Sequence, residues 1–299
     1  MKNVLRLLSV SLIGFAFPAF AFDHGLATRY PVVLVHGLFG FDRKAGIDYF
    51  FRIPETLRRH GARVYVAQVD PVNTSAARGE ELLAQVQAIL AISGASRVNL
   101  IGHSQGAPTA RYVAGVRPDL VASVTSVGGV NKGSAVADRL LALHGARSVV
   151  TEVLMKAMVG LIGIDLTPMS WHLVLRDLSS AGAVRFNRHF PQGVPRTDCG
   201  EGDYVVDGVR YYSWSGTAPV TNLFDPTDLP LGILSKAFSR PSDGLVDHCS
   251  SHLGQVIRDD YRMNHGDEIN QLLGLVAPTE IRPMRLYEAQ LRRLRDAGL

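Results

Sequence analysis

The stretch VNLIGHSQG, residues 98–106, decides which fold this chain can adopt. Its first four residues predict a buried strand, and residues 105–116 predict a helix. Between the two lies the pattern G-x-S-x-G, formed by Gly102, Ser104 and Gly106. This pattern is typical of a sharp strand-to-helix turn that exposes a serine hydroxyl above the carboxyl edge of a sheet. Ser104 is therefore the candidate nucleophile, and the N–H groups at the start of the helix would face a developing oxyanion.

Strand-like and helix-like segments alternate on both sides of this turn. Further strands are expected at 31–35, 62–69 and 120–127, and helices at 53–60 and 80–92. Strands that alternate with helices indicate an α/β fold with a mainly parallel sheet flanked by helices. After residue 129 the pattern changes: we expect no strand at 130–190, short strands at 204–206 and 209–214, and a late helix at 264–273.

Length and composition exclude several classes of protein. The chain has 299 residues, of which 46% are hydrophobic and 19% charged, and these values fit a globular fold rather than a disordered, collagen-like or coiled-coil chain. A formal net charge of +4 is too small and too scattered to indicate nucleic-acid binding. Because no repeat or linker-like stretch interrupts the chain, we expect residues 22–299 to form a single domain.

The N-terminus has the pattern of a secretory signal peptide. Lys2 and Arg6 precede an apolar run that ends at Ala19-Phe20-Ala21, a small-x-small cleavage site. The alternative is an uncleaved membrane anchor, but a run of about 15 residues is shorter than the roughly 20 that span a bilayer. We therefore expect residues 1–21 to be removed, the protein to be secreted, and no stable transmembrane segment to remain.

The two cysteines, Cys199 and Cys249, fit this compartment. An exported chain meets oxidising conditions, where an even number of cysteines predicts a disulfide. Two unpaired buried thiols are the alternative.

A nucleophile on such a turn takes its oxyanion donors from the backbone. One donor belongs to the residue after the nucleophile, and the other to a loop after an early strand. These rules assign the N–H groups of Gln105 and Leu38. His36, at the start of the same loop, is expected to hold the loop rather than to transfer a proton.

The other members of a serine triad would follow Ser104, with the acid before the histidine. His265 is favoured by its position ahead of the late helix, and His252 is next. For the acid, Asp243 lies at a turn that we expect to lead into an apolar strand. Single aspartates are more often turn formers, so other residues compete: Asp225, Asp228 and Asp247.

Six motifs distributed along the chain carry a family resemblance: YPVVLVHG at 30–37, GFD at 40–42, VNLIGHS at 98–104, YYSWSG at 211–216, SSHLG at 250–254 and YRMNH at 261–265. With them the chain resembles the secreted bacterial true lipases of the Pseudomonas and Burkholderia type, which are triacylglycerol lipases of the alpha/beta-hydrolase fold. The resemblance covers nearly the whole mature chain and implies Asp243 and His265 as the partners of Ser104.

The resemblance also implies a structural Ca²⁺ ion and a periplasmic partner. The ion would be held by the carboxylates of Asp225 and Asp267 and the backbone carbonyls of Gln271 and Leu275, which are oxygen donors that suit it. Without calcium, Asp267 would form a salt bridge or a helix cap. The partner is a lipase-specific foldase, and the implied disulfide joins Cys199 and Cys249.

A helical lid is implied within residues 130–180. The apolar stripe at 149–162 is the expected lid, which would open at a lipid–water interface; a helix packed in the core is the alternative. The sequence thus predicts a secreted serine carboxylester hydrolase, most specifically a triacylglycerol lipase. An esterase or polyester depolymerase with the same triad is one alternative, and a non-catalytic binding protein of the same fold is a remote one.

Overall fold

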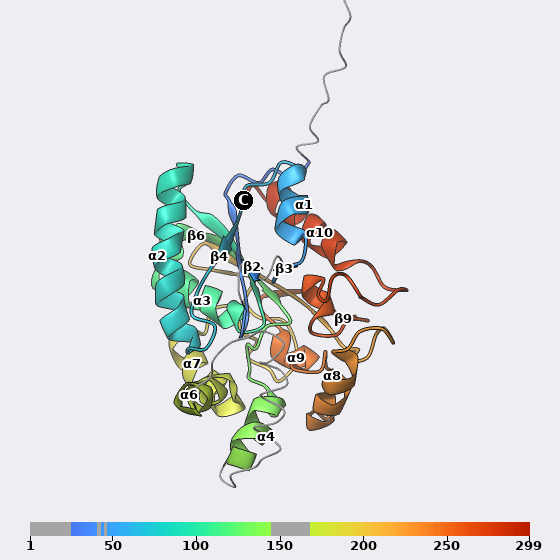
Figure 1. Ribbon diagram of the computed structural model, residues 1–299. Coiled ribbons are helices and arrows are strands. Elements are labelled where there is room, and N and C mark those ends of the chain that lie inside the picture. The colour runs from blue at the N-terminus through green and yellow to red at the C-terminus, as the bar shows by residue number, and fades with distance from the viewer. Residues whose placement is uncertain (1–24, 41–42, 45–46, 145–167) are drawn as a thin grey trace, which may run out of the picture.

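Seven strands form the central sheet of the computed structural model, which describes residues 25–40, 43–44, 47–144 and 168–299 (Figure 1). The order is β4-β1-β5-β6-β8-β7, and β9 also pairs with β8. The strands are β1 (Val32–Val35), β4 (Val64–Ala67), β5 (Val98–His103), β6 (Val121–Val127), β7 (Val205–Val206), β8 (Val209–Gly216) and β9 (Gln255–Tyr261). Every pair in this sheet is parallel except β7 with β8, which confirms the mainly parallel sheet. A separate two-stranded ribbon joins β2 (Arg43–Lys44) to β3 (Ile47–Asp48).

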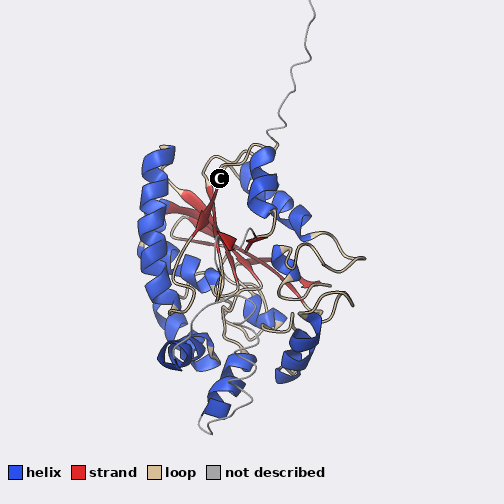
Figure 2. Ribbon diagram, viewed as in Figure 1, coloured by secondary structure: helices blue, strands red, loops and turns tan. Residues whose placement is uncertain are grey.

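Helices cover both faces of the sheet because neighbouring side chains of a strand point to opposite faces. Val32 and Leu34 belong to the same core cluster as residues of α1 (Ile53–Arg59) and α10 (Pro283–Asp296). Val33 and Val35 belong to the opposite cluster, with α2 (Ser75–Ser93) and α3 (Gly106–Val116). Figure 2 shows the strands between these two helical layers. Since β1, β5 and β6 are buried along their whole length, their apolar runs are those of central strands.

The remaining helices gather beyond one end of the sheet (Figure 1). They are α4 (Ala135–His144), α6 (Pro168–Leu178), α7 (Ser180–His189), α8 (Asp228–Leu234) and α9 (His248–Ser251). Short 3-10 turns occur elsewhere in the described chain, at η1 (Pro118–Leu120), directly before β6, at η2 (Ser235–Ala237) and at η3 (Asp267–Ile269). Phe39 stacks on Trp171 in a third apolar cluster between these helices and the sheet, with ring centroids 5.6 Å apart. The described residues between 130 and 190 contain no strand, as predicted. No described helix is long and apolar enough to cross a membrane.

Several expectations for the C-terminal third were wrong. Only η3 forms where a helix at 264–273 is expected, because Asn270 and Leu273 have φ values of 61° and 55°, which a right-handed helix cannot continue through. No strand begins directly after Asp243, where one was expected; an isolated bridge joins Ser242 to Asp247 instead. Strand β9 and helix α10 were not predicted from the sequence. The expected signal peptide at 1–21 and the apolar stripe at 149–162 lie outside the described residues.

Candidate active site

Ser104 lies at the turn between β5 and α3. Its φ of 56° falls in the left-handed region, where a residue other than glycine is strained. A Cβ atom on Gly102 would lie 2.3 Å from the Gly106 carbonyl oxygen, and a Cβ atom on Gly106 would lie 2.1 Å from the Val35 carbonyl oxygen. Glycine is therefore required at both positions, and the turn is the one that the G-x-S-x-G pattern predicts.

Asp243 and His265 form a buried pair. Asp243 Oδ2 lies 2.7 Å from His265 Nδ1, and the carboxylate is fully buried. Asp243 Oδ1 accepts hydrogen bonds from the N–H groups of Leu245 and Val246, both at 2.8 Å. The His265 N–H also donates to the Asp243 carbonyl oxygen at 2.9 Å. These contacts fix the imidazole so that Nδ1 faces the carboxylate and Nε2 remains for proton transfer.

The pair lies close to the nucleophile. The ring of His265 packs against that of His103, the residue before Ser104, with centroids 4.5 Å apart. No hydrogen bond between the Ser104 hydroxyl and His265 forms among the residues that the structure describes. In unliganded enzymes such catalytic bonds are often long and tighten when substrate binds.

The loop after β1 passes directly beside Ser104. A Cβ atom on Gly37 would lie 2.7 Å from Ser104 Cβ. Across the described ranges, the backbone N–H groups of Leu38 and Gln105 donate no hydrogen bond, whereas that of Phe39 donates to the Pro71 carbonyl at 2.9 Å. Two N–H groups available beside a serine are what an oxyanion hole requires.

Arg78, which the sequence analysis does not single out, ties these two loops together. Its buried guanidinium donates to the His36 carbonyl oxygen and, at 2.6 Å, to Gln105 Oε1. The His36 ring contacts the Gly37 carbonyl through Nδ1 at 2.9 Å and the Val69 N–H through Nε2 at 3.4 Å. Burial and, to a lesser extent, the Arg78 charge lower the pKa of His36 to about 4, so this ring is neutral near pH 7. These contacts support the predicted structural role of His36.

A second chain of buried polar groups links the oxyanion loop to His265. The Tyr49 hydroxyl accepts the Gly37 N–H at 3.1 Å and lies 2.7 Å from His103 Nδ1. His103 Nε2 lies 3.1 Å from the His265 carbonyl oxygen. Burial lowers the pKa of His103 well below its usual value, so the ring is neutral. Nε2–H therefore donates to His265, and Nδ1 accepts from Tyr49. Sequence reasoning misses Tyr49 because its contact with His103 spans 54 residues.

The residues that compete for the acid and base roles have other partners. Asp247 accepts from Ser250, Asp228 from Thr221 and Asn222, and Asp225 from Thr227, while His252 pairs with Asp259. Among the candidates from the sequence, the structure brings Asp243 and His265 together.

The residues expected to bind calcium offer unused oxygen atoms. Asp225 and Asp267 are both buried, and Asp267 Oδ1 has no hydrogen-bond partner among the described residues. Burial and the nearby Asp225 carboxylate raise the pKa of Asp267 to about 7. Within the described chain, the carbonyl oxygens of Gln271 and Leu275 accept no backbone hydrogen bond. A buried carboxylate oxygen without a donor, beside a second carboxylate, fits a hard cation.

A disulfide joins Cys199 to Cys249, as predicted. It links the segment before β7 to α9, which follows the Asp243 loop.

Comparisons with known proteins identify the class. A family described as alpha/beta hydrolase fold matches residues 30–146. The mature form of a Bacillus licheniformis lipase superposes with a TM-score of 0.63 at 15% identity, over 89% of this chain and 92% of the other. A metagenomic carboxyl esterase superposes with a TM-score of 0.60 at 19% identity, over 90% of this chain and 76% of the other. At such identities the likeness concerns the fold alone. With its parallel sheet and serine turn, the protein is an alpha/beta hydrolase.

Relatives of higher identity define the family more narrowly. The chain is 53% identical to a triacylglycerol lipase of Vibrio cholerae over 312 aligned positions that cover all of both chains. It is 43% identical to a triacylglycerol lipase of Pseudomonas fragi, over 93% of this chain and 100% of the relative. It is 38% identical to a triacylglycerol lipase of Burkholderia plantarii, over 94% of this chain and 90% of the relative. The chain belongs to this family of bacterial triacylglycerol lipases, and the resemblance stated from its motifs is confirmed.

Proposed function

We propose that this protein is a secreted enzyme that hydrolyses triacylglycerols through Ser104, Asp243 and His265. Membership of the lipase family makes it a serine ester hydrolase. The assignment of the three residues rests on one observation, the buried 2.7 Å pair of Asp243 and His265 beside a serine held at positive φ.

The proposed reaction has two halves. His265 Nε2 takes the Ser104 proton as Oγ attacks the acyl carbonyl carbon, and the N–H groups of Leu38 and Gln105 stabilise the oxyanion. The ester C–O bond then breaks, and His265 returns the proton to the departing alcohol. His265 then takes a proton from water as the water oxygen attacks the acyl carbon, the bond from that carbon to Ser104 Oγ breaks, and His265 returns the proton to Oγ as the fatty acid leaves. Asp243 stabilises the imidazolium in both halves.

An exposed apolar surface is the candidate contact with lipid. We call it the α8 apolar surface; it consists of Leu223, Phe224, Leu229 and Ile233, which are 96%, 83%, 73% and 62% exposed. The buried side of the same helix packs on the acid loop, since a Cβ atom on Gly244 would lie 2.8 Å from Cβ of the buried Leu231. Clustered exposed apolar side chains mark interaction sites, and a lipid–water interface suits a lipase.

The experiment that tests the function compares emulsified triolein with dissolved p-nitrophenyl butyrate. We expect the mature protein to hydrolyse the emulsion, and Ser104→Ala to lose at least about 10⁴-fold on both substrates. Activity on the soluble ester alone would make the protein an esterase with the same triad rather than a lipase. Folded protein inactive on both substrates would contradict the proposal.

We also propose a structural Ca²⁺ bound by Asp225, Asp267 and the carbonyls of Gln271 and Leu275. The unpartnered Asp267 oxygen supports this site. Calcium would neutralise two buried carboxylates and stabilise the segment that carries His265. A chelator should lower the melting temperature of the wild type, and added calcium should restore it, whereas Asp267→Asn should respond to neither. A wild-type melting temperature unchanged by chelator would contradict the site.

We propose export with removal of residues 1–21 and folding assisted by a periplasmic foldase. The charged and apolar pattern of the N-terminus and the disulfide support export. N-terminal sequencing of protein recovered from the medium should begin at Phe22, and coexpression of a foldase should raise the yield of active enzyme. An intact N-terminus in cell membranes would contradict the export proposal.

A further inference from the structure

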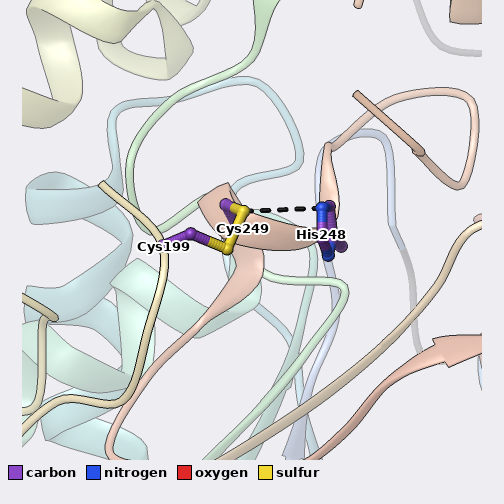
Figure 3. A group of neighbouring side chains, drawn as sticks. All are labelled: Cys199, His248 and Cys249. Atoms are coloured by element: carbon purple, nitrogen blue, oxygen red, sulfur yellow. Dashed lines mark hydrogen bonds between the residues drawn. A yellow bond between two sulfur atoms is a disulfide. The ribbon is translucent and has the colours of Figure 1, made fainter. Parts of the chain in front are cut away.

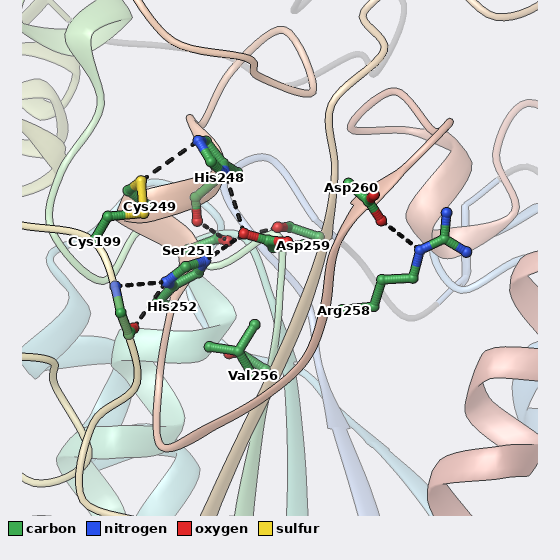
Figure 4. Close-up of polar contacts among 12 residues, drawn as sticks. Cys199, His248, Cys249, Ser251, His252, Val256, Arg258, Asp259 and Asp260 are labelled. Atoms are coloured by element: carbon green, nitrogen blue, oxygen red, sulfur yellow. Dashed lines mark hydrogen bonds and ion pairs between the residues drawn. A yellow bond between two sulfur atoms is a disulfide. The ribbon is translucent and has the colours of Figure 1, made fainter.

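His248, His252 and Asp259 converge beside the disulfide (Figure 4). Figure 3 shows His248 next to the bond between Cys199 and Cys249. Asp259 Oδ2 lies 3.0 Å from His248 Nδ1 and 2.9 Å from His252 Nε2. The three atoms all lie within 4.8 Å of one another. None of these residues has a role in the proposed ester hydrolysis.

The surroundings of His252 determine which nitrogen carries its proton. Nδ1 lies 2.8 Å from the Gly200 carbonyl oxygen, and the Gly200 N–H is farther away at 3.3 Å. Two acceptors cannot meet at 2.8 Å, so Nδ1 carries the hydrogen and donates to the carbonyl. In a neutral ring, Nε2 then presents its lone pair to the Asp259 carboxylate, which is also an acceptor. A positive charge must lie between them, either a second proton on His252 or a metal ion.

We propose that His248, His252 and Asp259 bind a divalent transition-metal ion of the zinc type. Two imidazole nitrogens and one carboxylate oxygen form a set that zinc prefers, unlike the all-oxygen set of the calcium site. Ligand atoms around a tetrahedral zinc ion at about 2.1 Å lie roughly 3.4 Å apart, so the two N···O pairs, now 3.0 and 2.9 Å apart, would have to open by only a few tenths of an ångström to admit the ion. The Nδ1–H bond of His252 to a backbone carbonyl is the outer contact that orients most metal-binding histidines.

The charges around Asp259 leave it available for a metal. In the described part of the chain, its ion-pair partners are His248 and His252 alone. Arg258, the neighbouring cation, pairs with Asp260 and Glu280 instead, and Figure 4 shows the Arg258–Asp260 pair apart from the histidines. The side chains of His248 and Asp259 are 24% and 32% exposed, so an ion can enter and keep a water ligand.

Rigid elements hold the three ligands. His248 begins α9 and His252 follows its last residue, while Cys249 between them is bonded to Cys199. Asp259 belongs to β9, which pairs with β8 of the central sheet. A bound ion would therefore join α9, β9 and the Gly200 backbone, and we expect it to stabilise the fold rather than to take part in the reaction.

The test is calorimetric titration of the full mature chain with ZnCl₂. The buffer contains saturating CaCl₂ and no reductant, so that the thiols of Cys199 and Cys249 cannot act as ligands. We expect about one Zn²⁺ per chain and a rise in melting temperature. His248→Asn and Asp259→Asn should each weaken binding by at least about 10–100-fold. Cobalt bound in place of zinc should give a visible ligand-field spectrum that both variants lose.

Matched controls separate the site from the rest of the surface. Asp260→Asn removes the adjacent carboxylate of the same strand, and His189→Asn removes an exposed histidine of α7; both should bind zinc as the wild type does. Circular dichroism and hydrolysis of the soluble ester show that each variant is folded. Absence of zinc binding, or equal binding by wild type and His248→Asn, would overturn the proposal and leave His252 and Asp259 as an ion pair.

Discussion

Asp243 differs from the other loop aspartates in where its carboxylate points. Its Oδ1 accepts two backbone N–H groups of its own turn, as a turn-forming aspartate does, but its Oδ2 contacts His265, 22 residues away in the sequence. In Asp247 the carboxylate caps α9, and in Asp228 it accepts the N–H groups of Thr221 and Asn222. Asp228 has a distant contact as well, because its Oδ1 accepts from the Asn264 side chain at 2.8 Å. Asp243 is distinguished from the other candidates because its distant contact is with a histidine beside Ser104.

Asp243→Asn should lower kcat by about 10⁴-fold with little change in the free energy of unfolding, because an amide would favour the wrong tautomer of His265. Asp247→Asn is the matched control, since asparagine also caps helices, and it should retain wild-type turnover. Rates of p-nitrophenyl butyrate hydrolysis and denaturant titrations measure both quantities. A turnover of Asp243→Asn within tenfold of wild type would rule Asp243 out as the acid.

His36 gives the protein a pH-dependent stability. Its pKa is about 4 in the folded state against 6.5 in an unfolded chain, so the unfolded state binds the proton first as pH falls. The contribution of His36 is therefore complete above pH 6.5 and is lost between pH 6.5 and about 4, to a total of about 3 kcal/mol. Urea titrations at several pH values across this range should show that the free energy of unfolding falls less steeply with falling pH in His36→Asn than in the wild type. Equal slopes would show that His36 is not the titrating group.

Single residues were predictable from sequence where the signal is local. Ser104 follows from five consecutive residues, and the turn around it supplies its own context. From the residues alone, His265 and Asp243 could only be ranked, because the contacts that select them join distant segments; the family resemblance then singled them out. Tyr49 and Arg78 carry no sequence pattern, and their roles come from contacts with His103 and Gln105 across the fold.

Elements with uniform apolar runs were predicted well, and amphipathic charged ones were not. Strands β5 and β6 are buried throughout, so their sequences contain little but apolar and small residues. In β9 the middle residues are Arg258, Asp259 and Asp260, and its burial alternates irregularly. Helix α10 buries Leu286, Leu291 and Leu294 along one face, but arginines lie between them. A search for helical spacing of leucines past Pro283 would have found this helix.

The α8 apolar surface yields a prediction about the interface. Phe224→Ser should reduce hydrolysis of emulsified triolein several-fold and leave hydrolysis of dissolved p-nitrophenyl butyrate unchanged, because Phe224 is 83% exposed and makes little contribution to the core. Ile92→Ser is the control: Ile92 is 74% exposed but lies on α2, which covers a face of the sheet. If both variants lose emulsion activity equally, the α8 apolar surface is not a specific lipid contact.

In the whole molecule, parallel strands bring the site residues together. Ser104 follows β5 and the oxyanion loop follows β1, its neighbour in the sheet, so both lie at the same edge. No local sequence pattern predicts the strand order β4-β1-β5-β6-β8, because each pairing joins segments that are distant in sequence. The α/β class and most strands of the sheet were predictable from local patterns, although β9 was not, and the position of His265 against His103 required the structure.

The disulfide should contribute to the free energy of unfolding of the whole chain. Cys199 and Cys249 are 50 residues apart, and closing a loop of that length stabilises the folded state by about 4 kcal/mol in the chain-entropy description. Cys199→Ser should lower the free energy of unfolding by up to this amount, measured by urea titration without reductant. Cys249→Ser and the double variant should lose the same amount, because one bond is removed in each case. Wild-type stability in these variants would show that the bridge does not constrain the unfolded chain.

The most direct measurement is covalent labelling with a p-nitrophenyl alkylphosphonate, which traps a serine nucleophile as a stable analogue of the tetrahedral intermediate. We predict release of about one equivalent of p-nitrophenol, complete loss of ester hydrolysis, and a single adduct that peptide mass spectrometry locates on Ser104. Asp243→Asn should label far more slowly, and Asp247→Asn at the wild-type rate. An adduct on another residue, or persistent hydrolysis in protein fully labelled at Ser104, would contradict the assignment of Ser104 as the nucleophile.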